Sequence, residues 1–279
     1  MRKTWISRQA ALVAACLAVV LAAGPAAAEA PMCVMCGKEI GPGRYVQDQW
    51  RANFHLQHQN APRCYYCARA ISPFNTGGGV RYPGGREVCN VCHQTAITDQ
   101  GQAEAAMERV RARMTAWGLS FDYGQIPVRL VEQGTLNAMY GRGNAMHDGN
   151  INGLTTKRWT KDDKGRVLAR EVTISMLRGL PLEVYEKTMA HELMHAWMFL
   201  DRQPEHDPAL EEGVCNLAAY YVLQENDNEL ADFTREAMWR SRDPVYGGGL
   251  RRAIAFVRRH EFPGLVKMLR DHRDFPPGF

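Results

Sequence analysis

The sequence lacks a strong charge of either sign and has no hydrophobic run long enough to cross a bilayer as a helix. Its formal charge of +4 is the small difference between 34 basic and 30 acidic residues, which gives no reason to expect nucleic-acid binding. Hydrophobic residues make up 46% and charged residues 23% of the 279 residues, so wholesale disorder and a multi-span membrane protein are excluded. This length suits one large domain or two small ones.

Acidic residues are also absent from residues 1–28, which have the pattern of a secretory signal. A basic start precedes an apolar run at 10–23, and small residues end the segment at Ala28. As a helix this run would span about 21 Å, short of the ~30 Å hydrocarbon core, so a membrane anchor is the weaker alternative. Lipidation at Cys16 and a buried core helix are further alternatives. We expect cleavage after Ala28 and an exported protein, periplasmic or secreted, with no stable membrane anchor.

Residues 29–97 differ in composition from residues 98–279. They are rich in Cys, His, Gly and Arg and show little apolar periodicity, as in a small domain that something other than a hydrophobic core holds together. We expect an α+β architecture, in which a zinc module precedes a small antiparallel sheet and a mostly helical carboxyl-terminal half. The predicted helices are 102–117, 181–200, 208–224, 229–240, 249–259 and 264–271, the predicted strands are 127–131 and 167–176, and 141–165 is predicted as loop or hairpin.

Cysteine pairs separated by two residues dominate the first region. Two intervening residues let both side chains of a pair reach one ion from a tight turn, and four ligands complete a tetrahedral zinc site. The intervals between the pairs resemble those of a LIM domain, although the join at 59–63 is longer than the usual two residues. Taken in chain order, the first predicted site is Cys33, Cys36, His55 and His58, and the second is Cys64, Cys67, Cys89 and Cys92.

Disulfides are the alternative for these cysteines in an exported protein, but they would leave His55 and His58 without a role. Each predicted site has four protein ligands and no open position, so both zinc ions should be structural. The remaining thiols, Cys16 in the leader and Cys215 on an apolar helix, are poor candidates for a nucleophile. The LIM-like character also suggests a protein partner for this module.

The second region contains the sequence His191-Glu192-Leu193-Met194-His195. On a helix His191 and His195 lie one turn apart on one face, where both imidazoles can bind the same ion, and Glu192 is placed to act on a metal-bound water. Two histidines with ordinary hydrogen bonds in a core helix are the alternative. The pattern therefore predicts a catalytic zinc site.

A catalytic zinc ion needs a third protein ligand and an open position. Two adjacent glutamates, Glu211 and Glu212, lie on the next predicted helix, and the pair Glu212-Gly213 resembles the ligand helix of the gluzincin peptidases. We therefore expect Glu212 to be the third ligand and keep Glu211 as the alternative. Asn216 is one turn further along and could hydrogen-bond a zinc-bound histidine.

The order of the motifs resembles a known family. The LIM-like module is followed by HELMHAW at 191–197, LEEGVCN at 210–216, DPVYG at 243–247 and a closing Phe-Pro pair at 275–276. This combination resembles the plant organ-size-limiting LIM peptidases, the DA-one family, over most of the chain after residue 28. The resemblance implies a gluzincin metallopeptidase in which His191, His195 and Glu212 bind zinc and Glu192 is the general base.

The plant peptidases are ubiquitin-activated and cleave regulatory proteins. This sequence has a predicted signal and no evident ubiquitin-interacting helix before its zinc module, so we do not expect that regulation or those substrates here. We expect an exported homologue of bacterial type.

The expected function is that of a zinc-dependent endopeptidase with one catalytic and two structural zinc ions. It would act on a protein or peptide substrate through a metal-activated water, with Glu192 as general base. In zincin folds an edge strand beside the active-site helix holds the substrate, and 170–176 is the predicted strand. Tyr246, next to a glycine-rich turn, is the predicted oxyanion donor, with His260 as the alternative donor and core packing as the alternative role for Tyr246. The alternative functions are a zinc-binding interaction scaffold with a vestigial peptidase domain, and zinc storage.

Overall fold

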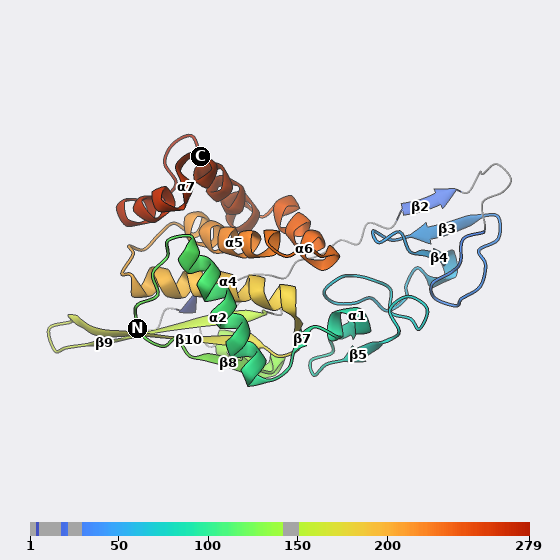
Figure 1. The fold of residues 1–279 in the computed structure, drawn as a ribbon, viewed down its shortest axis with the longest axis horizontal. Helices are drawn as coiled ribbons and strands as arrows, with labels where there is room; N and C mark the ends of the chain where they lie inside the picture. Colours follow the sequence, from blue (N-terminus) through green and yellow to red (C-terminus); the bar gives the residue numbers. More distant parts are fainter. Residues whose placement is uncertain (1–3, 6–17, 22–29, 142–150) are drawn as a thin grey trace. The chain divides into compact units, whose positions relative to one another are not determined.

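The computed structural model describes residues 4–5, 18–21, 30–141 and 151–279, and Figure 1 shows their fold. The chain divides into two compact units: residues 12–96 form one, and residues 1–11 together with 97–279 form the other. Within the predicted signal at 1–28, only 4–5 and 18–21 are described, and they are short strands. The predicted cleavage point at Ala28, as well as Cys16, lies outside the described residues.

The unit 12–96 consists of short strands and turns. Its elements are β2 (Ala18–Leu21), β3 (Arg44–Gln47), β4 (Asn53–His55), η1 (Leu56–His58), β5 (Gly79–Arg81), β6 (Glu87–Cys89) and α1 (Asn90–His93), with β7 (Ala96–Ile97) at its end. Strands β2, β3 and β4 form one antiparallel sheet, and β5 and β6 form a hairpin. One buried cluster in this unit contains only Cys33, Ile40, Val46 and Phe54. Such a small apolar cluster contributes little stability, in keeping with the expectation drawn from composition.

The sheet of the second unit has four strands in the order β1-β9-β10-β8. These strands are β1 (Thr4–Trp5), β8 (Val128–Val131), β9 (Gly153–Lys161) and β10 (Val167–Leu177), while β11 (Leu180–Pro181) lies outside this sheet. Strand β10 pairs antiparallel with β9 and parallel with β8. Gly165, at φ 79°, lies in the turn that joins β9 to β10. The segment predicted as loop or hairpin thus provides strand β9 and the hairpin turn.

The predicted substrate strand at 170–176 is not an edge strand. It lies within β10, where Ile174 is paired both with Thr155 of β9 and with Val128 of β8. The strand nearer the edge is β9, whose other side pairs antiparallel with β1 only at Thr155 and Thr156. Pairing between strands depends on segments far apart in the chain, so a β-prone pattern alone did not distinguish an inner strand from an edge strand.

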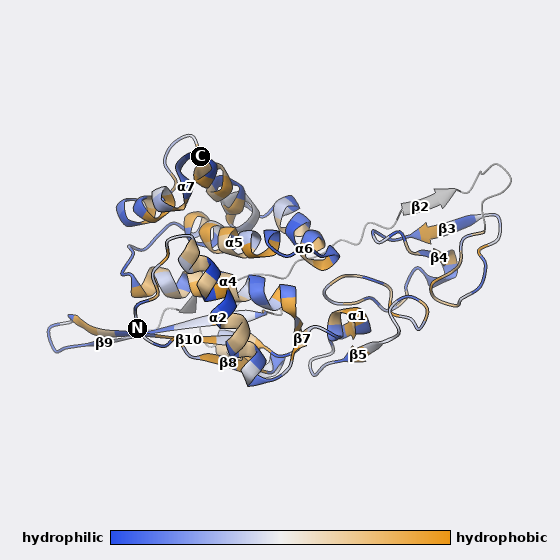
Figure 2. Cartoon of the chain, viewed as in Figure 1, coloured by the Kyte–Doolittle hydropathy of each residue, from blue (hydrophilic) through white to orange (hydrophobic). Residues whose placement is uncertain are grey.

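Helix α4 (Leu182–Leu200) is the central element of this unit. It is buried from residue 183 to residue 198 and packs against β9 and β10 on one side and against α2 (Gln100–Ala116) and α5 (Pro208–Gln224) on the others. Figure 2 shows mostly hydrophobic residues on α5, as its packing on several sides requires. At the start of α5, Asp207 accepts a hydrogen bond from the backbone N–H of Ala209, and Pro208 occupies the first turn.

The remaining elements are α3 (Gln133–Gly141), α6 (Glu229–Arg240), the short helix η2 (Pro244–Gly248) and α7 (Gly249–Asp271). Helix α5 approaches the start of α7 closely at Gly213. A side chain there would not fit, since a Cβ atom on Gly213 would lie 2.4 Å from the carbonyl carbon of Gly249. Helix α7 has a non-helical residue, Glu261 at φ 56°, two positions before Pro263. This break separates the two helices predicted at 249–259 and 264–271.

The predicted combination of helices with small sheets is confirmed, and α5 and α6 begin and end at the predicted residues. Helix α3 was not predicted. Within the described part of the chain, no helix is both long and apolar enough to cross a membrane.

Candidate metal centres

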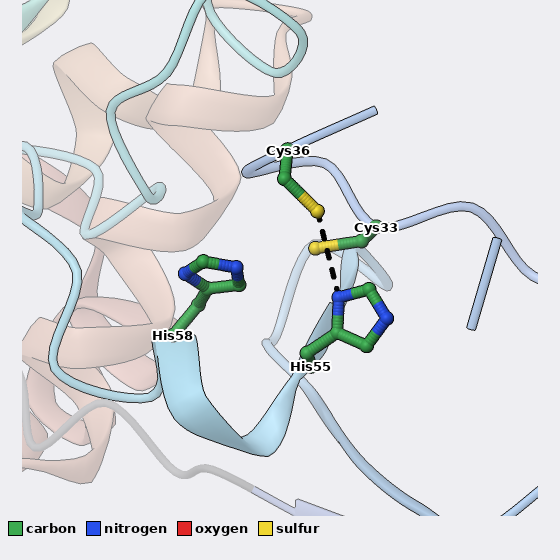
Figure 3. Close-up of side chains that lie close together, drawn as sticks. All are labelled: Cys33, Cys36, His55 and His58. Atoms are coloured by element: carbon green, nitrogen blue, oxygen red, sulfur yellow. Dashed lines mark hydrogen bonds between the residues drawn. The ribbon is translucent and has the colours of Figure 1, made fainter. Parts of the chain in front are cut away.

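The first Cys/His cluster brings together the four side chains predicted for the first site (Figure 3). The ligand atoms of Cys33, Cys36, His55 and His58 all lie within 4.8 Å of one another. The distance from Cys36 Sγ to His55 Nδ1 is 3.5 Å, close to the spacing of about 3.5 Å for sulfur and nitrogen ligands of one tetrahedral zinc ion. His55 Nε2 lies 3.3 Å from the carbonyl oxygen of Glu39. A carbonyl only accepts, so Nε2 carries the proton and Nδ1 has a lone pair for a metal ion.

His58 supplies a second sign that this cluster suits a cation. Its Nε2 atom is buried and has no hydrogen-bond partner among the described residues. Backbone N–H groups around Cys33, the first of them from His55, outweigh the effect of burial and lower the pKa of this thiol to about 7. A lower pKa favours the thiolate, which is the form that binds metal. This cluster could therefore hold a metal ion.

The second cluster is formed by four buried thiols, those of Cys64, Cys67, Cys89 and Cys92. Cys67 Sγ and Cys89 Sγ are 3.7 Å apart. That distance excludes a disulfide bond, which needs ~2.05 Å, and is close to the spacing of about 3.8 Å for two sulfur ligands of one zinc ion. All seven cysteines that the structure describes are free thiols. The disulfide alternative is therefore wrong for these residues, and the four thiols could hold a metal ion.

The first two C-x2-C turns have the same backbone form. A short β-bridge closes each turn, and the residue after the second cysteine is left-handed in both, Gly37 at φ 68° and Ala68 at φ 58°. Ala68 bears the steric cost of a conformation that glycine adopts freely. The two turns thus share one local backbone structure. Because this structure involves only neighbouring residues, the C-x2-C spacing in the sequence was enough to predict both turns.

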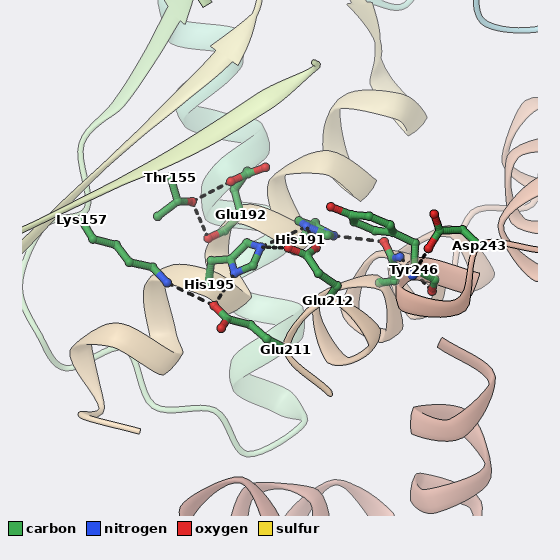
Figure 4. A network of polar contacts seen from close by, with 10 residues as sticks. Thr155, Lys157, His191, Glu192, His195, Glu211, Glu212, Asp243 and Tyr246 are labelled. Carbon is green, nitrogen blue, oxygen red and sulfur yellow. Dashed lines mark hydrogen bonds and ion pairs between the residues drawn. The ribbon is translucent and has the colours of Figure 1, made fainter. Parts of the chain in front are cut away.

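The two histidines of α4 meet at their Nε2 atoms (Figure 4). His191 Nε2 and His195 Nε2 are 3.2 Å apart, and both side chains are fully buried. At the other ring nitrogen, His191 Nδ1 lies 3.1 Å from Asn216 Oδ1, and His195 Nδ1 lies 3.1 Å from Glu211 Oε1. The contact between His191 and Asn216 is the one expected from the sequence.

These contacts fix the protons of both rings. Asn216 Nδ2 lies 3.3 Å from the carbonyl oxygen of Tyr246 and donates to it, so the amide oxygen faces His191. The oxygens of Asn216 and Glu211 accept protons from the two Nδ1 atoms, which leaves a lone pair on each Nε2 atom. Two lone pairs that face each other at 3.2 Å repel unless a cation lies between them. A metal ion satisfies both imidazoles at once.

Glu212 completes this group of donors. Its Oε2 atom is 3.3 Å from His191 Nε2, and its Oε1 atom is 3.7 Å from His195 Nε2. Ligands of one tetrahedral zinc ion lie about 3.3 Å apart. Glu212 Oε2 is also buried with no hydrogen-bond partner among the described residues. The distances and this unpaired oxygen fit a metal ion held by His191, His195 and Glu212.

The surroundings shift the pKa values of the two adjacent glutamates in opposite directions. Burial raises the pKa of Glu212 to about 8, although His195 opposes this. Burial also acts on Glu211, but the hydrogen bond with His195 and the ion pair with Lys157 outweigh it and lower the pKa of Glu211 to about 2. Burial lowers the pKa of His191 to about 4, so its imidazole is neutral at pH 7, the form that binds metal.

Cys215 lies nearer to this centre than the sequence suggested. Its thiol is within 4.8 Å of ligand atoms of both His191 and His195. The Glu212 oxygens lie 3.3 and 3.7 Å from the two Nε2 atoms, and burial raises the pKa of the Cys215 thiol well above its ordinary value. Glu212 and Cys215 both lie near enough to the imidazoles to contact a metal ion held there.

Glu192 faces strand β9 (Figure 4). Thr155 Oγ1 lies 2.7 Å from Glu192 Oε2 and 3.0 Å from the carbonyl oxygen of Glu192, so its single proton is shared between them. Strand β9 comes this close because Gly153 has no side chain, since a Cβ atom there would lie 2.9 Å from Glu192 Cγ. The candidate general base is thus held in place by the edge of the sheet.

Tyr246 lies in η2, beside the centre, and its ring extends toward His191 in Figure 4. Asp243 fixes the start of this turn, because its Oδ1 accepts hydrogen bonds at 2.9 Å from the backbone N–H groups of Val245 and Tyr246. His260, the alternative donor, is exposed on α7 and packs on Phe256, with ring centroids 4.5 Å apart. The arrangement favours Tyr246 over His260 as the residue near the centre.

Sequence reasoning missed the contributions of β9. Thr155 and Lys157 are two positions apart and point to the same face of the strand, where Thr155 contacts Glu192 and Lys157 pairs with Glu211. The polar sequence of this stretch carried no signal for these contacts, because Glu211, the partner of Lys157, lies 54 residues further along the chain.

The comparisons with known proteins agree with the order of motifs. The model of the DA1-like family, described as Protein DA1, matches residues 130–228. Protein DA1-related 1 of Arabidopsis thaliana is 30% identical over 70% of this chain and 40% of its own length. LIM domain-containing protein HDR3 of Oryza sativa subsp. japonica is 29% identical over 70% of this chain and 44% of its own length. Protein DA1-related 2 of Arabidopsis thaliana is 24% identical over 81% of this chain and 54% of its own length.

The chain spans about half the length of the curated relatives it matches. No solved structure shows a significant match. The matched segment 130–228 includes α4 and α5, which carry His191, His195 and Glu212. This chain therefore contains a DA1-like region and is a relative of the plant DA1 proteins.

Proposed function

We propose that this protein is a zinc-dependent endopeptidase, with its catalytic ion held by His191, His195 and Glu212. One observation carries the proposal: the Nε2 atoms of His191 and His195 are 3.2 Å apart, and the two oxygens of the Glu212 carboxylate lie 3.3 and 3.7 Å from them. Glu192 lies in the same turn of α4 as the first of these donors. Three buried donors beside a second carboxylate have little use in a core helix unless a cation binds there.

Zinc bound by these donors would supply Lewis acidity, which polarises a substrate carbonyl and makes a water molecule acidic near pH 7. Glu192 accepts the proton of the attacking water and returns it to the leaving amine. Thr155 holds one oxygen of Glu192 and so restricts the orientation of this carboxylate. His191, Glu192 and His195 are fully buried, so the surroundings exclude bulk water and strengthen each electrostatic contact.

The edge of β9 is the place proposed for an extended peptide. Thr4–Trp5 already adds a short antiparallel strand there, at Thr156 and Thr155. An extended substrate in the same position would use backbone hydrogen bonds and would pass Thr155, which contacts Glu192. Substrate binding requires that Thr4–Trp5 leave this edge, which removal of the predicted signal at 1–28 would accomplish. The mass of the mature chain tests that removal, since cleavage after Ala28 leaves Glu29 as the first residue.

Two further zinc ions would be structural, one in each Cys/His cluster of the unit 12–96. Each cluster offers four ligands, which leaves no open position for a substrate. A small unit of short strands and turns would depend on these ions for its stability. We propose that this module also binds a protein partner, which a pull-down with residues 30–96 deleted from the bait would test by losing that partner.

Hydrolysis of a peptide library, read by mass spectrometry, separates a peptidase from the alternative of a zinc-binding scaffold. The proposal expects new peptide termini that a chelator abolishes and added zinc restores. A scaffold with a vestigial site would bind zinc and leave the library intact, and that outcome would rule out the peptidase.

A further inference from the structure

Helix α5 presents two successive glutamates to the same histidine. Glu211 Oε1 is 3.1 Å from His195 Nδ1, and Glu212 Oε1 is 3.7 Å from His195 Nε2. Both residues are buried: Glu211 is 5% exposed and Glu212 is 3% exposed. Either one has the chemistry of a zinc ligand, so a feature outside α5 must determine which of them takes that place.

Lys157 of β9 forms a close ion pair with Glu211. Its Nζ atom is 3.2 Å from Glu211 Oε1, and the two side chains are 8% and 6% exposed. The same Glu211 oxygen accepts from His195 Nδ1. Lys157 also lies against the end of α4, with Nζ 6.0 Å from the centroid of the Phe199 ring. A buried pair of this kind holds both partners in place, because loss of either one leaves an uncompensated charge.

Glu212 is in the opposite situation. Its Oε2 atom faces His191 Nε2 at 3.3 Å and has no hydrogen-bond partner among the described residues. The lysine therefore satisfies the first carboxylate, and the second remains available to a metal ion.

We propose that Lys157 is a positioning residue that assigns the roles of the two glutamates: it holds Glu211 on the far side of His195, where Glu211 orients the imidazole, and leaves Glu212 as the metal ligand. This inference rests on the proposed zinc centre and deepens it. Carboxylates that orient a ligand histidine change metal affinity by about 10- to 100-fold. Without Lys157, Glu211 is free to turn toward the ion and compete with Glu212.

Zinc affinity of the full chain tests this assignment independently of turnover. The zinc bound at the proposed centre is measured by competition with a fluorescent chelator, and the His191→Ala variant gives the signal of the two Cys/His clusters alone. With native Lys157, Glu212→Gln should weaken zinc binding much more than Glu211→Gln. In the Lys157→Met background the effect of Glu212→Gln should shrink by about tenfold or more, because Glu211 can then replace the missing ligand.

Lys157→Arg is the matched control, since it keeps the charge near Glu211 and should preserve the native order of the two glutamates. If Glu212→Gln has the same effect in the native protein and in the Lys157→Met background, the assignment by Lys157 is wrong. Should Lys157→Met fail to fold, the two glutamate variants are compared in the protein that keeps Lys157. Equal losses of zinc affinity from Glu211→Gln and Glu212→Gln would then overturn the inference. If His191→Ala binds as much zinc as the native chain, the zinc centre itself is absent and the proposed function fails instead.

Discussion

Thr155 joins strand β9 to helix α4 at Glu192: its hydroxyl lies 2.7 Å from Glu192 Oε2. A hydrogen bond to a charged group contributes about 1.5 to 3 kcal/mol, enough to restrict the orientation of this carboxylate. We expect Thr155→Val, which keeps the shape of the side chain, to lower kcat by about tenfold or more with KM and zinc content unchanged. Thr155→Ser should restore most of the rate. A fall in zinc content, or equal loss in both variants, would show a structural role instead.

Tyr246 provides a test of the oxyanion donor. Removing one such donor costs about 10² or more in turnover, and Tyr246→Phe removes the hydroxyl while keeping the ring. We expect that loss at unchanged thermal stability. His260→Ala is the matched control and should retain its activity, because His260 is exposed and packs on Phe256. Normal turnover of Tyr246→Phe would mean that this tyrosine only packs.

The cysteines test the ligand sets. Cys64→Ser should remove zinc from the second Cys/His cluster and destabilise the unit 12–96, because four buried thiols meet there. Cys215→Ser should keep all three zinc ions, since the proposed third ligand of the histidine pair is Glu212. Elemental analysis of the purified variants measures both effects. A zinc ion lost in Cys215→Ser would make Cys215 a ligand of the centre in α4 and α5.

Lys187 gives a pH dependence of stability. Burial lowers the pKa of this lysine from 10.5 to about 7, so between pH 7 and 10.5 the unfolded chain binds more protons than the folded chain. The free energy of unfolding therefore rises with pH across that window, by on the order of a few kcal/mol. Lys187→Met should stabilise the protein most below pH 7 and remove this rise. Urea unfolding at about pH 6.5 and about pH 9.5 measures this rise in the free energy of unfolding, because the two pH values span most of the window. The exposed Lys267→Met is the control. If the free energy of unfolding rises with pH as steeply in Lys187→Met as in the native protein, the account is wrong.

Local patterns predicted the elements that local chemistry determines. Helix α5 was predicted from residue 208 to residue 224 because Pro208 marks its start and apolar residues follow at helical spacing. The C-x2-C turns and the pair His191 and His195 were found for the same reason, since both ligands of each pair lie within one turn of chain.

Contacts between distant segments account for what the sequence did not predict. The polar residues of β9 gave the pattern of a loop, although Lys157 and Thr155 are buried against α4 and α5. The sequence of 170–176 predicts a strand but contains no information on its two neighbours, β8 and β9. The role of Glu211 as a partner of His195 likewise depends on Lys157, which lies 54 residues away.

The central claim is that Glu192 acts as general base beside a zinc ion held by His191, His195 and Glu212. The most direct test is to measure zinc content and peptide-bond turnover together in Glu192→Gln and the native protein. The amide keeps the size of the side chain but cannot accept the proton of water, so the account predicts unchanged zinc and a loss of about 10² to 10⁴ in turnover. Turnover equal to that of the native protein at the same zinc content would contradict the account.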